Sequence, residues 1–290
     1  MKRLFALLLL PGAFALFEAA AFHLHNRDNG VLVSSGRRYT YLLHVPRRLD
    51  AARPVPLVIS LHGAGGWGVQ QKEASGWNEL ADREGFIVVY PTAAGNDGPN
   101  VWQKNDVRFI SELLDRLEAE YPIDRNRVYV NGLSNGGGMS FVLSCAMADR
   151  IAAAGMVAAA QTEPFSSCRD TRPVPVLAFH GTHDALTPYR GGSSWVWSGT
   201  FPDIVNWTAK WAKRNRCGRA IDIRIAADVV RRAYEGCKAD VVLYTIERGG
   251  HSWPGHDELP AGLTGRTTHS IDATREMWEF FKAHPRSTAR

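Results

Sequence analysis

Past its first segment, the 290-residue sequence has no apolar run of the about 20 residues that a membrane-spanning helix needs. At the start, Lys2 and Arg3 precede an apolar core over residues 4–10, and small residues follow at 19–21. This order is typical of a signal peptide over residues 1–21, and an uncleaved N-terminal anchor is the alternative. We therefore expect a secreted or periplasmic protein with no stable membrane insertion after cleavage.

The sequence also lacks a strong charge of either sign. Its 34 Lys and Arg residues against 29 Asp and Glu residues give a net charge of +5, spread along the chain. The short basic runs at Lys213-Arg214 and Arg231-Arg232 have no basic stripe or nucleic-acid-binding motif beside them. We therefore expect no nucleic-acid partner.

Cysteine is scarce, with four residues in the chain and none near the N-terminus, which excludes a lipid anchor on cysteine. No Cys-x-x-Cys or His-x-x-x-His cluster is present, so we expect neither a metal site nor a cofactor. An even number of cysteines in an exported chain favours disulfides over free thiols. Three pairings are possible, and the sequence-local one is preferred: Cys145–Cys168 with Cys217–Cys237.

Apolar strand patterns alternate with amphipathic helical patterns along the rest of the chain. Strands are expected at residues 31–45 (an antiparallel pair), 56–61, 86–90 (ended by Pro91), 128–130, 174–179 and 241–246. Helices are expected at residues 77–83, 107–121, 137–148, 204–215 and 273–283. This alternation predicts an α/β fold with a mostly parallel sheet covered by helices on both faces. With no repeat and no Pro/Ser/Thr-rich linker, residues 22–290 are expected to form one catalytic domain.

The strongest chemical signal is Gly-Leu-Ser-Asn-Gly at residues 132–136, between a β-rich segment and a helical one. A Gly-x-Ser-x-Gly turn between strand and helix is typical of a nucleophile elbow, which exposes the serine hydroxyl. Glycine fits at both ends because it has no Cβ to keep strand and helix apart. Ser134 is therefore the predicted nucleophile, and it needs a neighbouring base.

Two further residues follow later strands in an order that suits this nucleophile. Asp184 comes after the segment 174–179, and His251 follows the last strand through a Gly-Gly loop. The carboxyl ends of parallel strands gather at one edge of the sheet. Ser, Asp and His in this chain order are those of an α/β-hydrolase. Other candidates remain open: His180, His183 and His256 for the base, and Asp170, Asp203 (also a plausible helix cap) and Asp257 for the acid.

A glycine-rich turn at residues 62–66, after an early strand, is suited to bind the oxyanion of a tetrahedral intermediate. The backbone amides of Ala64 and Asn135 are the predicted donors, with Gly63 second to Ala64. A simple tight turn is the alternative.

With these pieces in place, the sequence resembles the esterase/polyhydroxybutyrate depolymerase family, which includes feruloyl and acetyl xylan esterases. The resemblance runs from about residue 41 to 284. It rests on six stretches: 61–66, 121–124, 128–137, 174–184, Pro188-Tyr189 and Gly-Gly-His-Ser-Trp-Pro-Gly at 249–255. It implies an α/β-hydrolase fold, the triad Ser134, Asp184 and His251, and the plausibility of the two sequence-local disulfides.

The resemblance and the residues together indicate a secreted serine carboxylesterase that needs no cofactor. We expect its substrate to be a small or oligomeric ester, including esters linked to a polysaccharide, since no substrate-binding module for solid polymer is evident. Four tryptophans, Trp67, Trp195, Trp197 and Trp253, are candidates for an aromatic wall at the substrate, with core or lid packing as the alternative. The competing hypotheses are a catalytically idle binding module and a serine peptidase on the same fold.

Overall fold

The computed structural model describes residues 29–50, 52–94, 99–159, 168, 172–194, 200–256 and 264–286. The predicted signal peptide lies outside these ranges. None of the helices within them has the length and apolar character needed to cross a membrane.

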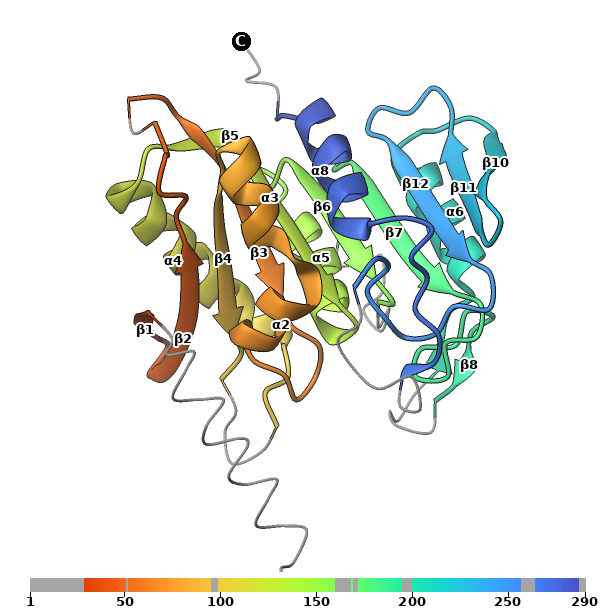
Figure 1. Ribbon diagram of the computed structural model, residues 1–290, viewed down its shortest axis with the longest axis horizontal. Coiled ribbons are helices and arrows are strands. Elements are labelled where there is room, and N and C mark those ends of the chain that lie inside the picture. Colours follow the sequence, from red (N-terminus) through yellow and green to blue (C-terminus); the bar gives the residue numbers. More distant parts are fainter. Residues whose placement is uncertain are drawn as a thin grey trace, which may run out of the picture.

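A ten-stranded sheet forms the centre of the molecule, in the order β1-β2-β4-β3-β5-β6-β7-β12-β11-β10 (Figure 1). The strands from β4 to β12 in this order run parallel, and the two edges are antiparallel. This matches the predicted mostly parallel sheet. The strand bounds are β1 Gly30–Ser34, β2 Arg37–His44, β3 Val55–Leu61, β4 Ile87–Thr92, β5 Ile123–Leu133, β6 Ala153–Val157, β7 Val176–Gly181, β10 Ala220–Ala226, β11 Val229–Tyr234 and β12 Val241–Ile246. A separate two-stranded ribbon pairs β8 (Gly192–Ser193) with β9 (Thr200–Phe201).

Helices cover both faces of this sheet (Figure 1). The helix bounds are α2 Gly68–Ser75, α3 Trp77–Glu84, α4 Val107–Glu120, α5 Asn135–Ala146, α6 Ile204–Arg214 and α8 Ala273–Ala283, with a short 3₁₀ turn η1 at Lys104–Asp106. Apolar residues of α4, α5 and α6 share one buried cluster, and those of α3 and α8 share another. β3 contributes alternate residues to the two clusters, since Leu57 and Ile59 lie in the first and Val58 lies in the second. Burial on both faces explains why the central strands are continuously apolar.

Several predicted boundaries differ from the structure, and the predicted end of the strand at residue 90 was wrong. β4 continues through Pro91 to Thr92, because β2 pairs with this part of the strand: Tyr41 lies opposite Pro91. On the other side, the ladder between β3 and β4 ends at the pair Ile59–Val89. The missing N–H of proline therefore leaves no parallel-ladder partner unsatisfied.

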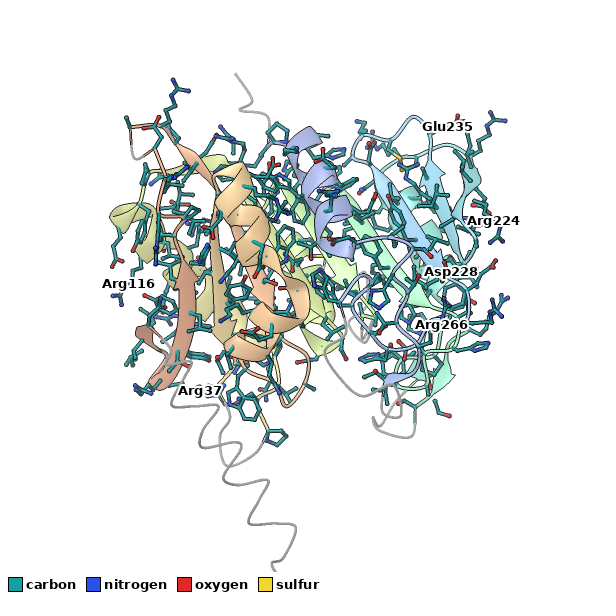
Figure 2. All side chains as sticks on the ribbon, in the orientation of Figure 1. Arg37, Arg116, Arg224, Asp228, Glu235 and Arg266 are labelled. Atoms are coloured by element: carbon teal, nitrogen blue, oxygen red, sulfur yellow. A yellow bond between two sulfur atoms is a disulfide. The ribbon has the colours of Figure 1, made fainter. Side chains whose placement is uncertain are left out.

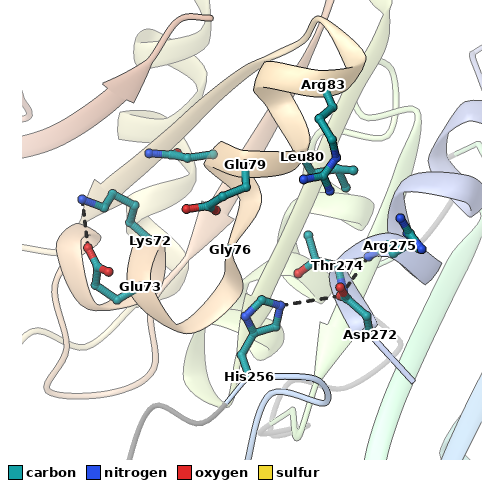
Figure 3. A pocket seen from close by; sticks show the side chains of 11 residues that line it. Lys72, Glu73, Gly76, Glu79, Leu80, Arg83, His256, Asp272, Thr274 and Arg275 are labelled. Carbon is teal, nitrogen blue, oxygen red and sulfur yellow. Dashed lines mark hydrogen bonds and ion pairs between the residues drawn. The ribbon is translucent and has the colours of Figure 1, made fainter. Parts of the chain in front are cut away.

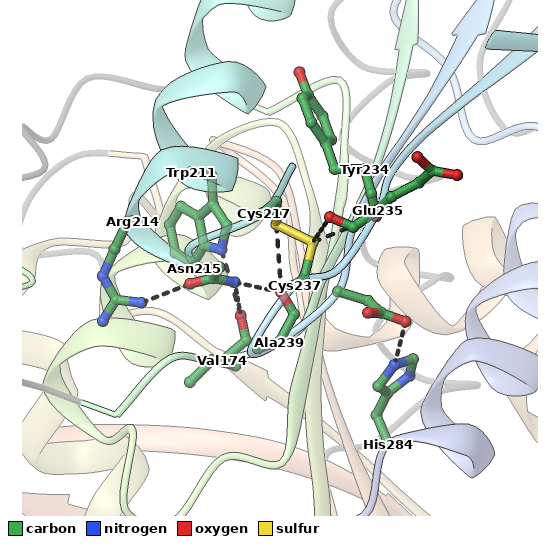
Figure 4. The surroundings of a disulfide bond; sticks show 11 residues. Val174, Trp211, Arg214, Asn215, Cys217, Tyr234, Glu235, Cys237, Ala239 and His284 are labelled. Carbon is green, nitrogen blue, oxygen red and sulfur yellow. Dashed lines mark hydrogen bonds and ion pairs between the residues drawn. A yellow bond between two sulfur atoms is a disulfide. The ribbon is translucent and has the colours of Figure 1, made fainter. Parts of the chain in front are cut away.

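Two disulfides join the cysteines in the sequence-local pairing, Cys145–Cys168 and Cys217–Cys237. Figure 4 shows the second bridge beside Asn215, whose side-chain amide donates to the carbonyls of Val174 and Ala239, each at 3.0 Å. The bridge and this amide thus fasten the end of α6 to the segments that lead into β7 and β12.

Candidate active site

The turn at residues 132–136 has the backbone of a nucleophile elbow. β5 ends at Leu133, α5 begins at Asn135, and Ser134 between them has φ 53° and ψ −117°. A positive φ is rare for a residue with a Cβ and costs on the order of 1–3 kcal/mol. The amide of Ser134 donates to the carbonyl of Val157 at 2.8 Å, which ties the strained residue to the end of β6.

The glycines on either side of this serine allow the close approach that the sequence suggested. A Cβ on Gly136 would meet the backbone carbonyls of Leu61 and His62, and one on Gly132 would lie 2.8 Å from the oxygen of Leu61. The elbow is therefore pressed against the end of β3 and the turn that follows it. A Cβ on Gly63 would lie only 3.5 Å from the Cβ of Ser134, so the predicted oxyanion turn borders the predicted nucleophile.

Asp184 and His251 form a hydrogen-bonded pair at the same edge of the sheet. They follow β7 and β12, which run parallel with Gly181 opposite Ile246, so both strands end side by side. The Nδ1 of His251 lies 2.8 Å from Oδ2 of Asp184. Both side chains are buried, with exposed fractions of 7% for His251 and 0% for Asp184. Since Nδ1 is engaged, Nε2 is the nitrogen of His251 that remains available to a substrate or a nucleophile.

The carboxylate of Asp184 is surrounded by donors. Its Oδ1 accepts from the amides of Leu186 and Thr187, and its Oδ2 accepts from the hydroxyl of Thr187 at 2.7 Å as well as from His251. Burial alone raises the pKa of this carboxyl, but the side chains of His180 and His251 outweigh burial and hold the pKa well below its ordinary value. Asp184 is therefore ionised at neutral pH and favours the His251 tautomer with the proton on Nδ1.

The competing histidines have other places in the structure. His180 is buried, and its Nε2–H donates to the carbonyl of Thr187 at 2.7 Å, so it supports the turn that holds Asp184. His183 is exposed, and His256 lies 3.6 Å from Asp272. Among the competing carboxylates, Asp203 caps α6 by accepting from the amide of Asn206, while Asp170 and Asp257 lie outside the described residues. Sequence reasoning missed the supporting roles of His180 and Thr187, although both lie within four residues of Asp184.

Some backbone amides of the glycine-rich turn donate to carbonyls within the protein, and others do not. The amide of Gly65 donates to Asn100 and that of Gly66 to Gly63, at 2.7 and 3.1 Å. Within the described ranges, the amides of Gly63 and Ala64 donate to no protein group. The amide of Asn135, the first residue of α5, has no carbonyl one turn earlier in the helix. In the described part of the chain, the backbone amides of Ala64 and Asn135 are therefore available to donate to a ligand.

Trp102 connects the elbow to this turn, a link that the sequence did not reveal. The side-chain Oδ1 of Asn135 accepts from the backbone amide of Trp102 at 2.7 Å, and the Nδ2 of Asn135 donates to the Trp102 carbonyl at 3.3 Å. The indole N–H of Trp102 in turn donates to the carbonyl of His62 at 3.0 Å. One buried tryptophan therefore fixes the spacing between the two elements that carry the predicted oxyanion donors.

Replacing Trp102 by Phe is expected to lower kcat for an ester by about tenfold and to leave KM nearly unchanged. The change removes one hydrogen bond and leaves the His62 carbonyl unpaired, which costs on the order of 1–2 kcal/mol in the position of the turn. Steady-state kinetics on a p-nitrophenyl ester measures this split. Trp211→Phe is the matched control, because its indole N–H donates to Val174 away from the site, and it should retain kcat. An equal loss in both variants would show that stability alone is affected.

His62 is held as a neutral ring. Its Nδ1–H donates to the carbonyl of Gly63 at 2.6 Å, and its Nε2 accepts from the amide of Ala93 at 3.0 Å. Burial lowers the pKa of His62 from 6.5 to about 4. A second ring proton would face the Ala93 N–H, so protonation breaks the contact that anchors the turn.

This depressed pKa predicts a loss of stability in mild acid. Because the unfolded chain binds the His62 proton more tightly, the ring's contribution is complete above pH 6.5 and is lost as pH falls through the folded pKa of about 4. The full shift corresponds to about 3 kcal/mol in the free energy of unfolding. Denaturant titrations at about pH 7 and about pH 4 measure it against His62→Asn, which has no titrating ring. A pH dependence of the same size in the variant would contradict this prediction.

Of the four candidate substrate-binding tryptophans, the structure gives clear positions for two. Trp253 is 1% exposed and its indole N–H donates to the hydroxyl of Thr274, so it packs in the core and does not form part of an open wall. Trp67 is 37% exposed and directly follows the glycine-rich turn, so its place at the substrate stays a prediction. Trp195 and Trp197 lie outside the described residues.

A cavity of about 310 Å³ has none of Ser134, Asp184 and His251 in its lining (Figure 3). It is lined by side chains of α2, α3 and the start of α8, together with His256. Its charges are mixed, with Arg83 and Arg275 beside Glu79 and Asp272. In the described part of the chain, no group of His, Cys, Asp and Glu side chains could hold a metal ion.

Comparisons with known proteins agree with this architecture. A family model described as "Esterase PHB depolymerase" matches residues 39–168. The chain is 32% identical over 226 residues to feruloyl esterase B of Piromyces equi, covering 73% of this chain and 42% of that protein. It is 28% identical over 290 residues to a probable feruloyl esterase C of Aspergillus clavatus, covering 95% and 94%.

Two solved structures share the fold. An acetyl xylan esterase from Aspergillus awamori superposes with a TM-score of 0.62 at 15% identity, covering 87% of this chain and 98% of that one. Esterase 2 of Thermogutta terrifontis gives a TM-score of 0.58 at 13% identity, covering 89% and 94%. The chain therefore has the α/β-hydrolase fold. Within that fold, the chain is similar to the esterase family that includes the polyhydroxybutyrate depolymerases over residues 39–168, and to feruloyl esterases over most of its length.

The relatives differ in length from this chain. The chain spans 42% of the Piromyces protein and 22% of the bifunctional acetylxylan esterase/xylanase XynS20E of Neocallimastix patriciarum, to which it is 34% identical over 151 residues.

Proposed function

We propose that this protein is a secreted serine carboxylesterase that acts through Ser134, His251 and Asp184. The observation that carries the proposal is the buried pair of Asp184 and His251, at 2.8 Å, on the same edge of the sheet as the strained turn at Ser134. The names of the relatives support ester hydrolysis as the reaction.

In the proposed reaction, the Ser134 hydroxyl attacks the ester carbonyl and Nε2 of His251 takes its proton. Asp184 holds the ring in the required tautomer and stabilises the imidazolium that forms. The amides of Ala64 and Asn135 donate to the oxyanion of the tetrahedral intermediate. His251 then returns the proton to the leaving alcohol and activates water to release the acyl group. A hydrogen bond from the Ser134 hydroxyl to Nε2 of His251 is expected to form when substrate binds.

We further infer that residues 1–21 are an export signal and that residues 22–290 form one catalytic domain. The ten strands from β1 to β12 build a single sheet, which supports one domain. Two disulfides support folding in an oxidising compartment outside the cytoplasm. We infer no nucleic-acid partner and no stable membrane insertion once the signal has been cleaved.

The proposed substrates are small or oligomeric esters, including those linked to polysaccharide. Relatives named feruloyl esterase and acetylxylan esterase support hydroxycinnamoyl and acetyl groups as acyl candidates. A panel of methyl ferulate, p-nitrophenyl acetate, p-nitrophenyl butyrate and a hydroxybutyrate trimer tests this. Turnover of at least one ester, together with labelling by a fluorophosphonate probe, is expected. A folded protein that neither turns over any of them nor takes the probe would instead be an idle binding module.

A further inference from the structure

β10 is the last strand on one side of the ten-stranded sheet. Its inner side pairs with β11, and no strand of the described chain pairs with its outer side. In Figure 1, β10 lies at the right-hand margin of the molecule with no element beyond it. A free edge of this kind presents a row of N–H and C=O groups that another strand can pair with.

The sequence of this edge strand is self-complementary. Ala-Ile-Asp-Ile-Arg-Ile-Ala over Ala220–Ala226 reads the same in both directions, except that Asp222 and Arg224 exchange places. In an antiparallel pair of two copies centred on Ile223, each Ile223 lies opposite its equivalent. Asp222 of one copy then lies opposite Arg224 of the other, twice over by symmetry.

The alternation places the two kinds of side chain on opposite faces of the sheet. Ile223 and Ile225 are 51% and 42% exposed, and they are two of the five large apolar side chains exposed in the described part of the chain. Pairing would bring Ile223 against its equivalent in the other copy. Cross-strand contacts between β-branched residues stabilise antiparallel pairs.

On the charged face, Asp222 and Arg224 each form an ion pair within the chain. Arg232 of β11 donates to both carboxylate oxygens of Asp222 at 2.7 Å, and Arg224 donates to both carboxylate oxygens of Glu247 at 2.6 and 3.0 Å. These contacts limit the rotamers of Asp222 and Arg224 at the margin of the sheet, where Figure 2 shows Arg224. The β-bulge between Arg224 and Ala226 comes at the end of the strand, so the three central positions have regular backbone.

We propose that two copies of this chain associate through β10, antiparallel and about a twofold axis at Ile223, to form one continuous sheet. The partner is a second copy because the strand's own sequence places Arg224 opposite Asp222 and Asp222 opposite Arg224 in the same register. Such a contact uses the same surface on both subunits and closes as a dimer.

Sedimentation velocity over a dilution series tests the proposal on the purified protein. The wild type is expected to show twice the mass of the chain and to dissociate on dilution. Ile223→Lys places two ammonium groups opposite each other and should give a monomer. The matched control is Val33→Lys on β1, which is 65% exposed at the other edge of the sheet and should leave the dimer intact.

Two charge-reversal variants, tested singly and mixed, show whether dimer formation depends on opposite charges across the strand pair or only on the folding of each variant. Arg224→Asp alone gives Asp opposite Asp, and Asp222→Arg alone gives Arg opposite Arg, so each should be monomeric. Mixed in equal amounts, the two variants face each other with opposite charges at both positions and should form a heterodimer. Circular dichroism and thermal unfolding confirm that each variant is folded.

Three results would overturn the proposal. They are a monomeric wild type throughout the series, dissociation by Val33→Lys but not by Ile223→Lys, and two monomeric charge variants that stay monomeric when mixed.

Discussion

Ser134→Ala is expected to lower ester turnover by at least about four orders of magnitude while the protein stays folded. The side-chain oxygen that would form the acyl-enzyme is removed, and no other hydroxyl occupies the elbow between β5 and α5. The Ser134 hydroxyl donates to no protein group in the described part of the chain, so its loss leaves no buried partner unsatisfied. The free energy of unfolding should therefore change by less than about 1 kcal/mol.

Steady-state hydrolysis of p-nitrophenyl acetate and labelling by a fluorophosphonate probe measure the effect. Ser144→Ala is the matched control, since this serine lies on α5 and its hydroxyl donates to the carbonyl of Phe141. That variant should hydrolyse the ester and take the probe like the wild type. Retained turnover in the Ser134 variant would remove Ser134 from the reaction.

Much of the architecture could be predicted because the central strands follow simple physical patterns. Continuous apolar segments such as β3 and β12 are buried on both faces of a parallel sheet, and helices such as α8 have a regular apolar stripe. The bounds of β12 and α8 match the prediction. The family resemblance and the α/β-hydrolase fold are also confirmed.

The missed elements depend on contacts that lie far apart in sequence. β6 is Ala-Ala-Gly-Met-Val, whose small residues are poor strand formers, and a Cβ on its Gly155 would overlap the sulfur of Met277 on α8. α2 has almost no apolar stripe, and its buried Gln71 instead donates to Ser60 of β3 at 2.9 Å. A pattern within a short stretch of sequence cannot predict these contacts between distant segments. The hairpin of β10 and β11 was missed although the alternating isoleucines of β10 are a strand signal.

The candidate site also contains residues that the sequence could suggest and residues that it could not. The elbow, the acid and the base follow strand ends in order, so Ser134, Asp184 and His251 could be proposed from the sequence, and their roles stay a prediction. Trp102 could not be proposed, because its contacts to Asn135 and His62 span 33 and 40 residues. Trp253 lies two residues after His251, yet it is turned into the core.

Asp184→Asn is expected to lower kcat by about 10⁴-fold. The amide of an asparagine can donate to Nδ1 of His251, which would move the ring proton to Nε2 and prevent the ring from accepting the proton of Ser134. The native carboxylate also accepts from the amides of Leu186 and Thr187 and from the Thr187 hydroxyl, and one amide oxygen cannot satisfy all of these donors. The variant should therefore also unfold at lower denaturant concentration near neutral pH.

The stability difference between the wild type and this variant has a defined pH dependence. The pKa of Asp184 is held below that of the unfolded chain, so its contribution is present above about pH 4 and is lost as pH falls toward the folded value. The two proteins should thus converge in stability in acid. Asp203→Asn is the matched control for activity, since asparagine also caps a helix and the Asp203 carboxylate accepts from the Asn206 amide at the start of α6. If Asp203→Asn lost activity and Asp184→Asn retained it, the acid would be Asp203, and the buried pair of Asp184 and His251 would have no part in the chemistry.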